Sequence, residues 1–345
     1  MGPPPAVAAV RTAVRATLAQ LDAARPLLVA CSGGADSLAL AASVAFEAPR
    51  AGRAAGAVVV DHGLQAGSAE IARSVADVLR HLGLEPVEVV AVGVGTPGGP
   101  EGAARTARYD ALARIAGDAY VLLGHTRDDQ AETVLLGLGR GSGPRSIAGM
   151  RRIDGRYVRP LLDVSRATTE AACAALGLDV WNDPHNLDPR FRRVRLRTEA
   201  LPLLEEILAG GVAEALARTA VQIRADVDAL DQLAASWLDA HGGSADRPGL
   251  RPPGAPDPDR LSDPRADSTA GPGLAVALLL ELPAALRTRV LRRWAHAGGA
   301  ASLSAVHIAA LDALCTDWHG QGPLDLPGRV CAARRSGRLH LDPSA

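Results

Sequence analysis

The chain has 345 residues, which is more than one ordinary domain needs and predicts two. Apolar residues make up 48% of it and aromatic residues only 3%, so its cores must be built mainly from alanine, valine and leucine. The net charge of −1 excludes a polycation, so any contact with nucleic acid must come from a local basic patch.

Strands and helices alternate along the first 140 residues. Short apolar runs bounded by glycine or polar residues predict strands at 27–31, 56–61, 87–94 and 120–124. Helical spacing of apolar residues predicts helices at 5–24, 36–47, 67–82, 101–116 and 128–138. Because strands separated by helices of this length form parallel sheets, the expected fold is α/β, with a doubly wound, mainly parallel sheet. Such sheets bind ligands at the carboxyl ends of their strands.

The rest of the chain predicts a second, smaller domain that is mostly helical, so we divide the chain into residues 1–200 and 201–345. Helices are predicted within 199–240, 286–297 and 302–318, and a short hairpin within 324–330 and 339–341. Residues 241–273 are rich in Gly, Pro, Asp and Ser, which predicts a mobile insert. No apolar run is long enough for a membrane span, and the start does not resemble a signal peptide, so we expect a cytoplasmic protein.

The stretch after the first strand has the form of a phosphate cradle. Its sequence is Ser32-Gly33-Gly34-Ala35-Asp36-Ser37. Glycine lets the backbone approach an anion closely, and the N–H groups at a helix start can bind it. A Walker loop is excluded because the chain contains no lysine, and residues 32–37 do not have the Rossmann glycine pattern Gly-x-Gly-x-x-Gly. The alternative is an ordinary joint between a strand and a helix.

A second polar cluster, His125–Thr133, follows the fourth predicted strand. Asp129 and Glu132 are three residues apart and therefore share one helix face. Asp128 and Asp129 lie near the helix N-terminus, where carboxylates are stabilised. The cluster predicts a site for Mg²⁺ or for an ammonium group; the alternative is helix capping alone.

Two groups of arginines predict contacts with phosphate. Arg105 and Arg108 lie at i and i+3 of a predicted helix and can clamp the charge of a triphosphate. Arg193, Arg195 and Arg197 form a strip that can bind RNA phosphates. In both cases the alternative is a solvated basic surface. The four cysteines are scattered without a C-x-x-C pair, which predicts neither a disulfide framework nor a zinc site.

Further motifs follow the 32–37 loop in a fixed order. They are Val60-Asp61-His62-Gly63-Leu64, Ala104-Arg105 with Arg108-Tyr109, Gly124-His125-Thr126 with Asp128 to Thr133, Arg159-Pro160-Leu161-Leu162, Trp181-x-Asp183-Pro184-x-Asn186, and Phe191-x-Arg193-x-Arg195-x-Arg197. This series resembles the tRNA(Ile)-lysidine synthetase family of the PP-loop ATP pyrophosphatase superfamily, closely over about residues 25–205. Two positions depart from the family pattern: this chain has Gln65 where the family usually has an arginine, and Val194 where the family usually has an asparagine.

The resemblance implies a PP-loop fold of the adenine nucleotide alpha hydrolase type, with ATP and Mg²⁺ as cofactors. ATP adenylates O2 of the wobble cytidine in an isoleucine tRNA with a CAU anticodon, and the ε-amine of free L-lysine then attacks C2 and releases AMP. The implied partners are the tRNA, free lysine and a second copy of the chain in a homodimer.

The resemblance also implies roles for particular residues of this chain. The implied catalytic residues are Asp36, Asp129 and Arg105. The implied ATP-binding residues are Ser32, Gly33, Gly34, Ala35, Asp36, Ser37, Asp61, His62 and His125. Asp129 and Glu132 would hold the lysine, Asp36 and Asp128 the Mg²⁺, and Arg193, Arg195 and Arg197 the tRNA.

Three alternatives remain at this point. A tRNA thiolase of the same superfamily would usually need paired or cluster-binding cysteines. An amide-forming ATP pyrophosphatase would lack the arginine strip and the acidic helix. An inactive nucleotide- or RNA-binding module would be expected to have lost Asp36, Asp129 or Glu132, and all three are present.

Overall fold

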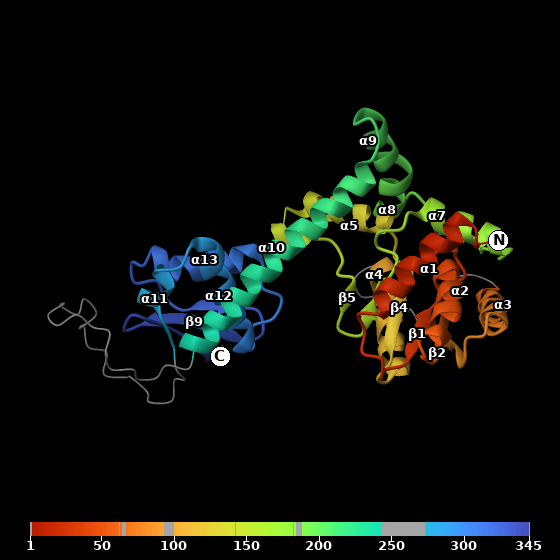
Figure 1. The fold of residues 1–345 in the computed structure, drawn as a ribbon. Helices are drawn as coiled ribbons and strands as arrows, with labels where there is room; N and C mark the ends of the chain where they lie inside the picture. Colours follow the sequence, from red (N-terminus) through yellow and green to blue (C-terminus); the bar gives the residue numbers. More distant parts are fainter. Residues whose placement is uncertain are drawn as a thin grey trace. The chain divides into compact units, whose positions relative to one another are not determined.

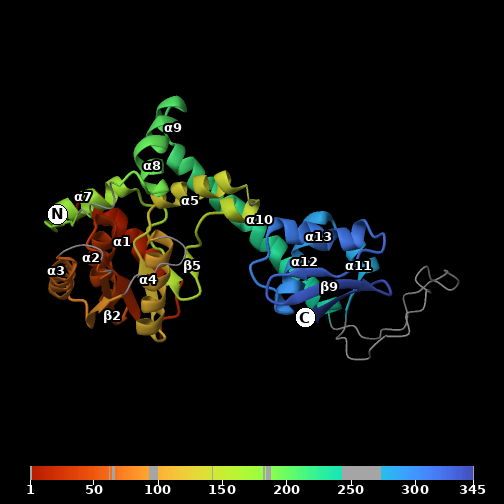
Figure 2. The ribbon, with the colours of Figure 1, turned by 180° about the vertical axis from the view of Figure 1, so that it is seen from behind.

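Figure 1 shows the chain in a computed structural model, and Figure 2 shows its reverse side. The structure describes residues 2–61, 63, 67–92, 100–141, 143–181, 183, 188–242 and 273–344, with the backbone alone at 100–105. The chain forms two compact units, Met1–Gly141 with Ser146–Val221, and Ser142–Arg145 with Gln222–Ala345. Most of the insert predicted at 241–273 lies outside the described residues, so that prediction is not tested.

The first unit is built on a six-stranded sheet. Its strands are β1 (Leu27–Ala30), β2 (Ala55–Asp61), β3 (Val87–Ala91), β4 (Tyr120–Leu123), β5 (Ile153–Asp154) and β6 (Tyr157–Val158). They lie in the order β3-β2-β1-β4-β6-β5, and every neighbouring pair is parallel except β5 with β6. The prediction of a mainly parallel α/β sheet is confirmed.

Helices cover both faces of this sheet (Figures 1 and 2). They are α1 (Pro5–Leu18), α2 (Ala35–Arg50), α3 (Ser68–His81), α4 (Pro100–Ala116) and α7 (Arg166–Leu176). The helix α5 (Arg127–Arg140) follows β4 and extends away from the sheet (Figure 1). On β1, Leu27 and Val29 pack into one core with α1, α2, α3 and α7, whereas Leu28 and Ala30 pack into a second core with α4. Because both faces of β1 are buried, its sequence is a continuous apolar run.

After the sheet, the chain continues through short helices. These are α8 (Arg192–Arg195), the π-helical turn η2 (Leu196–Ala200) and α9 (Leu201–Ile207), before the long α10 (Val212–His241). Another short helix, α6 (Pro144–Ile147), lies earlier, between α5 and β5. The helical region predicted at 199–240 is thus mainly two separate helices, α9 and α10. Gly210 and Gly211 have φ of 91° and 76°, which ends regular helix there. The Glu205 carboxylate accepts the N–H groups of Val212 and Ala213 and so caps the start of α10.

The second unit packs helices against a small antiparallel sheet. Besides the end of α10 it contains β7 (Leu274–Ala275), α11 (Val276–Leu280), α12 (Ala284–Ala297), α13 (Ala305–Thr316), β8 (Leu324–Leu326), β9 (Val330–Arg335) and β10 (Arg338–Pro343). The sheet has the order β7-β10-β9-β8. The hairpin predicted within 324–330 and 339–341 differs in its first strand, because 324–330 holds β8 and only the first residue of β9, and the observed hairpin is β9–β10. β8 pairs with β9 and β7 with β10, and apolar residues of both join the same core. Among the helices of the described ranges, none is long and apolar enough to cross a membrane.

The packing of α5 gives a stability prediction. A Cβ placed on Gly137 would lie 2.0 Å from the carbonyl oxygen of Ser146, whereas one on Gly139, in the same helix, would meet no atom within 4 Å. We expect Gly137→Ala to destabilise the protein by about 1–3 kcal/mol, because the backbone at Ser146 must move. Gly139→Ala, the control, should be neutral or stabilising by up to about 1 kcal/mol. Urea unfolding measures both, and equal effects would contradict the close packing.

Candidate functional site

The two central strands bring the predicted cradle and the acidic helix together. β1 and β4 are parallel neighbours with Ala30 opposite Leu123, so the segments that follow them leave the sheet at the same edge. The chain runs from β1 to β2 on one side and returns to β4 on the other, and ligands bind at such switch points. Gly124 allows close approach here, since a Cβ on it would lie 3.0 Å from backbone atoms of Asp36 and Ser37.

The loop between β1 and α2 has the geometry of an anion cradle. Gly33 has φ of 85°, and a Cβ on it would lie 2.6 Å from a methyl group of Val75. The Ser37 hydroxyl donates to the Gly34 carbonyl at 2.9 Å and accepts the Ser32 N–H at 3.2 Å, which fixes the loop. Gly34 is the N-cap of α2 and has no side chain to bond the first N–H groups of that helix. These N–H groups can therefore bind an anion.

A cavity of about 130 Å³ lies beside the cradle. Its walls are mainly apolar and come from the ends of β1 and β2 and from α3, with polar groups from Asp61, Arg108 and Asp183. Trp181 also lines the cavity, and its backbone N–H donates to the Gly33 carbonyl at 3.0 Å. Predicted site residue His62 and the side chain of Arg105 lie outside the described part of the chain.

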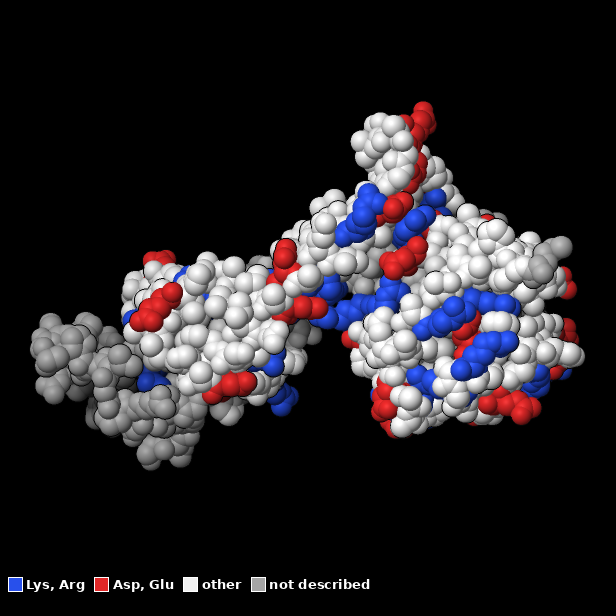
Figure 3. Space-filling view, viewed as in Figure 1, with Lys and Arg blue, Asp and Glu red and all other residues white. Residues whose placement is uncertain are grey.

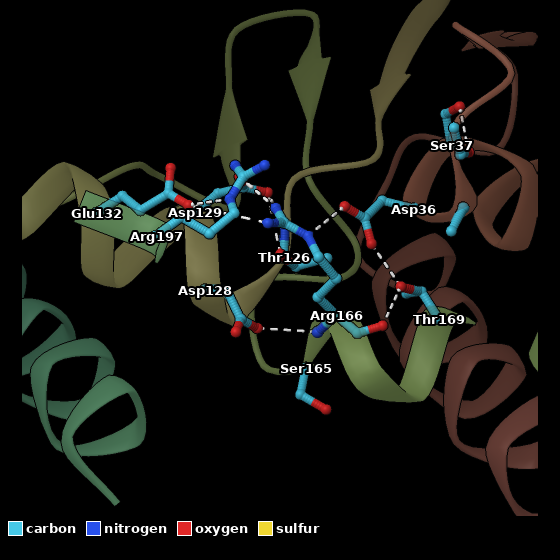
Figure 4. A network of polar contacts seen from close by, with 12 residues as sticks. Asp36, Ser37, Thr126, Asp128, Asp129, Glu132, Ser165, Arg166, Thr169 and Arg197 are labelled. Carbon is cyan, nitrogen blue, oxygen red and sulfur yellow. Dashed lines mark hydrogen bonds and ion pairs between the residues drawn. The ribbon is translucent and has the colours of Figure 1, made fainter. Parts of the chain in front are cut away.

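Arg166, at the start of α7, joins the cradle to the acidic helix (Figure 4). Its guanidinium donates to the Asp36 carboxylate at 3.2 Å and to the Asp129 carboxylate at 3.0 Å. The Thr169 hydroxyl donates to the other oxygen of Asp36. A single cation therefore connects the helix that follows β1 with the helix that follows β4.

Glu132 lies one helical turn beyond Asp129, and none of its side chain is exposed. Its Oε1 accepts a hydrogen bond from Arg197 Nε at 2.8 Å, and Arg197 Nη2 lies 3.5 Å from Asp129. Its Oε2 is 3.6 Å from Arg193 Nη1 and accepts no hydrogen bond from the part of the chain that the structure describes. A buried carboxylate oxygen without a donor has room for a hydrogen bond from a ligand.

The surroundings shift the pKa values of these carboxylates in different directions. Burial raises the pKa of Glu132, against the opposing effect of Arg197. Burial likewise raises the pKa of Asp36, although Arg166 and Thr169 act against it. For Asp129 burial is outweighed by Arg166, the Thr126 N–H, His125 and Arg197, so its pKa is lowered. The pair Asp129 and Glu132 therefore combines an ionised carboxylate with one that takes up a proton more readily.

The remaining predicted acidic residue, Asp128, contacts the backbone of Arg166 rather than its guanidinium. Asp128 accepts the backbone N–H of Arg166 at 2.8 Å, which fixes the start of α7. Thr126 and Asp129 form a capping box at the start of α5, so Asp129 caps this helix in addition to its contacts with Arg166 and Arg197. His125 is half-buried and lies two residues after the end of β4. Within the described ranges, no group of three His, Cys, Asp or Glu side chains is arranged to hold a metal ion.

The structure separates the three arginines predicted to bind RNA. Arg193 and Arg197 lie against Glu132, as described above. Arg195 forms an exposed ion pair with Glu199 at 2.8 Å, one turn along the chain. Figure 3 shows that basic and acidic side chains are interspersed on the face it presents, in keeping with the small net charge.

Sequence reasoning missed Arg166 and Thr169, and assigned no role to Trp181 or Asp183. The available signal for the first two was a helix start, Ser165-Arg166-x-Thr168, in which Ser165 accepts the Thr168 N–H as N-cap. That signal predicts the helix but not its neighbours, because Arg166 lies 130 residues from Asp36 along the chain.

Comparison with known proteins agrees with this geometry. A PP-loop domain model matches residues 8–204, and a TilS substrate binding domain model matches residues 274–340. The tRNA(Ile)-lysidine synthase of Thermobifida fusca is 53% identical over 343 residues, which cover 98% of each chain. The chain belongs to the tRNA(Ile)-lysidine synthase family. Members of this family are ligases that form a carbon–nitrogen bond, and their PP-loop domain uses ATP.

Other tRNA(Ile)-lysidine synthases are similarly close. That of Salinispora tropica is 53% identical and covers 99% of this chain and 98% of its own. That of Streptomyces coelicolor is 50% identical, and the match covers 98% of this chain and 99% of the relative. Among solved structures, the U34-tRNA thiolase NcsA from Methanococcus maripaludis, described with its [4Fe-4S] cluster, has a TM-score of 0.54 at 17% identity over 64% of this chain and 80% of that chain. This last likeness concerns the fold alone.

Proposed function

We propose that this protein converts the wobble cytidine of an isoleucine tRNA with a CAU anticodon to lysidine, using ATP and free L-lysine. The observation that carries the proposal is the buried pair Asp129 and Glu132, linked through Arg166 to Asp36 at the phosphate cradle. The pair supplies the carboxylates that a lysine ammonium needs, next to a loop suited to the phosphates of ATP.

The ATP site of the proposal is the cradle and the cavity beside it. The phosphates bind the N–H groups at residues 32–37, and the nucleoside occupies the apolar cavity lined by β2 and α3. O2 of the cytidine attacks the α-phosphorus, and pyrophosphate leaves. Arg105 and Arg108 on α4, together with His62 and His125, are proposed to contact the nucleotide.

Magnesium fits this site as an ion carried by the phosphates. Mg²⁺ is commonly held by one or two carboxylates together with substrate phosphates, and it neutralises charge on the leaving pyrophosphate. Asp36 lies in the cradle itself and is the proposed ligand, with Asp128 as the second. Asp36 also accepts hydrogen bonds from Arg166 and Thr169, which hold its carboxylate in place.

The second step uses the acidic pair. Asp129, whose pKa is lowered, binds the ε-ammonium group. Glu132, whose pKa is raised, accepts a proton from it, and the neutral amine attacks C2 of the cytidine as AMP departs. The Oε2 atom of Glu132 is the proposed acceptor because it has no donor among the residues that the structure describes.

One experiment separates this proposal from its alternatives. The protein is incubated with Mg-ATP, labelled lysine and a transcript of isoleucine tRNA, and label is sought in the RNA. Incorporation that depends on ATP supports the proposal. AMP release that depends on sulfide would favour a thiolase, release that depends on ammonia an amide-forming enzyme, and no release at all an inactive binding module.

The arginine strip gives a further prediction for tRNA binding. Arg195 is exposed, so Arg195→Gln should weaken tRNA binding and reduce the salt slope by roughly 0.7–0.9, the value for one phosphate. Arg197→Gln should instead raise the lysine KM, because it removes the hydrogen bond to Glu132. Binding titrations over a range of salt concentrations measure the first effect and steady-state kinetics the second. If Arg195→Gln leaves the slope unchanged, Arg195 is only a solvated residue.

The two parts of the chain have separate proposed roles. Residues 1–200 form the catalytic domain, and residues 201–345 form the tRNA-binding domain. Its matched segment, residues 274–340, corresponds to a substrate binding domain. A cytoplasmic location follows from this role as a prediction.

A further inference from the structure

The second unit contains a cavity of about 400 Å³ that no step above uses. It lies between the second-unit part of α10, α12, Arg145 and the segment that precedes α13, and all the residues that line it belong to that unit. The residues that line it are Arg145, Asp231, Ala234, Arg289, Arg292, Arg293, His296, Ser302 and Leu303. Its volume is within the range of about 300–1,000 Å³ that is typical of ligand pockets.

The cations of this cavity are arranged along one helix face. Arg289, Arg292, Arg293 and His296 follow one another at i, i+3, i+4 and i+7 on α12, so their side chains project in the same direction. Arg145 joins them from the short helix α6. Such a face would repel itself in the absence of an opposite charge.

The cavity contains one carboxylate, that of Asp231, and two arginines share it. Arg145 Nη2 is 2.5 Å and Arg289 Nε is 3.2 Å from the same oxygen, Oδ1. Arg292 instead donates to the Leu303 carbonyl at 2.6 Å. Burial lowers the pKa of Arg292, and the nearby charges of Arg145 and Arg289 lower it further, against the effect of Asp231. The cavity thus carries more positive charge than its own acid can balance.

We propose that this cavity binds a backbone phosphate of the RNA substrate. Guanidinium groups bind phosphate through paired hydrogen bonds, and several of them converge here. The lining contains no Phe, Tyr or Trp among the described residues, so it offers phosphate contacts rather than base stacking. The α12 residues also fall within the segment matched by a substrate binding domain, residues 274–340. This proposal rests on the proposed function, because the RNA that it concerns is the isoleucine tRNA named there.

The test measures tRNA binding by the full-length protein without ATP or lysine. Dissociation constants are determined over a range of salt concentrations for the wild type and for the double variant Arg292→Gln, Arg293→Gln. We expect weaker binding and a log–log salt slope smaller by roughly 0.7–0.9 for each phosphate that the variant no longer binds. The matched control is Arg335→Gln, which removes one positive charge from β9 of the same unit, where Arg335 pairs with Asp342 outside the cavity. The control should bind like the wild type.

A second variant changes binding in the opposite direction. Asp231→Asn removes the acid that occupies Arg145 and Arg289, so it should tighten tRNA binding and steepen the salt slope. This outcome cannot result from misfolding, which would weaken binding. A melting curve accompanies each variant.

Three results would overturn the proposal. One is an unchanged salt slope in a folded double variant, and another is an equally large decrease of affinity in the Arg335→Gln control. The third is binding of inorganic phosphate that the double variant abolishes while its tRNA affinity is unchanged, because the cavity would then take a free anion. The proposed function is judged separately, by lysine incorporation in the wild type, so failure of one does not decide the other.

Discussion

Asp36→Ala is expected to abolish ATP-dependent pyrophosphate release. Asp36 lies in the cradle at the start of α2, and its carboxylate accepts hydrogen bonds from Arg166 and Thr169. In the proposed function, its removal would leave Mg²⁺ and the departing phosphates without a ligand, and it would also release Arg166 from the cradle. The loss should be at least about 10²–10³-fold in kcat, the usual result of deleting a group that stabilises charge in the transition state.

The measurement is pyrophosphate release with saturating ATP, lysine and tRNA. Asp118→Ala is the control, since Asp118 belongs to the same unit and its side chain is 87% exposed. Asp36→Asn keeps the shape of the side chain and should lose nearly as much activity if Asp36 is the proposed Mg²⁺ ligand, because Mg²⁺ binds the charged carboxylate. Normal turnover in both Asp36 variants would disprove the assignment of the cradle.

Glu132→Gln should raise the lysine KM by about ten- to a hundred-fold. The carboxylate is fully buried beside Asp129, and hydrogen bonds to charged groups contribute roughly 1.5–3 kcal/mol. The substitution keeps the shape of the side chain and removes its charge. Adenylation of the tRNA needs no amine and should survive better than lysidine formation, so adenylated tRNA should accumulate. Separate assays of the two half-reactions measure this difference.

The same variant has a predicted pH signature. Because burial raises the pKa of Glu132 above its ordinary value of 4.5, the ionised form that accepts a proton becomes available only at higher pH than for an exposed carboxylate. For the wild type, kcat/KM for lysine should therefore rise as pH increases through this raised pKa. Glu132→Gln should lose this acid limb.

Asp129→Asn distinguishes the two members of the acidic pair. It should impair both half-reactions if Asp129 also contacts the metal, and only the second if it does not. Equal loss of both half-reactions in a folded Glu132→Gln variant would count against a lysine site there and would favour a metal ligand instead.

The sequence by itself predicted the local structure around the site. The apolar run at 27–31 became β1, the glycines after it became the cradle, and the spacing of Asp129 and Glu132 placed both on one face of α5. These features could be predicted because they depend on residues close together in the chain. Local apolar spacing decides between strand and helix, and a few residues mark the start of a helix. The parallel sheet followed because helices of that length separated the strands.

The sequence predicted the ends of helices and the strands of the second unit less well. The first helix ends at Leu18 rather than at residue 24, because the chain must turn there to enter β1 while Leu21 stays buried. Strands β7 and β8 are two and three residues long, too short to give a period of their own, and they form only because β9 and β10 offer partners.

Only the tertiary structure decided which charges meet. Arg166 contacts Asp36 and Asp129, which are far from it in sequence, and Arg197 contacts Glu132 from a helix that periodicity does not relate to α5. The arginines at 193–197 look alike in sequence, yet two of them lie against buried carboxylates and Arg195 does not. Burial is the physical reason: it selects which carboxylates need partners, and it depends on how the whole chain packs.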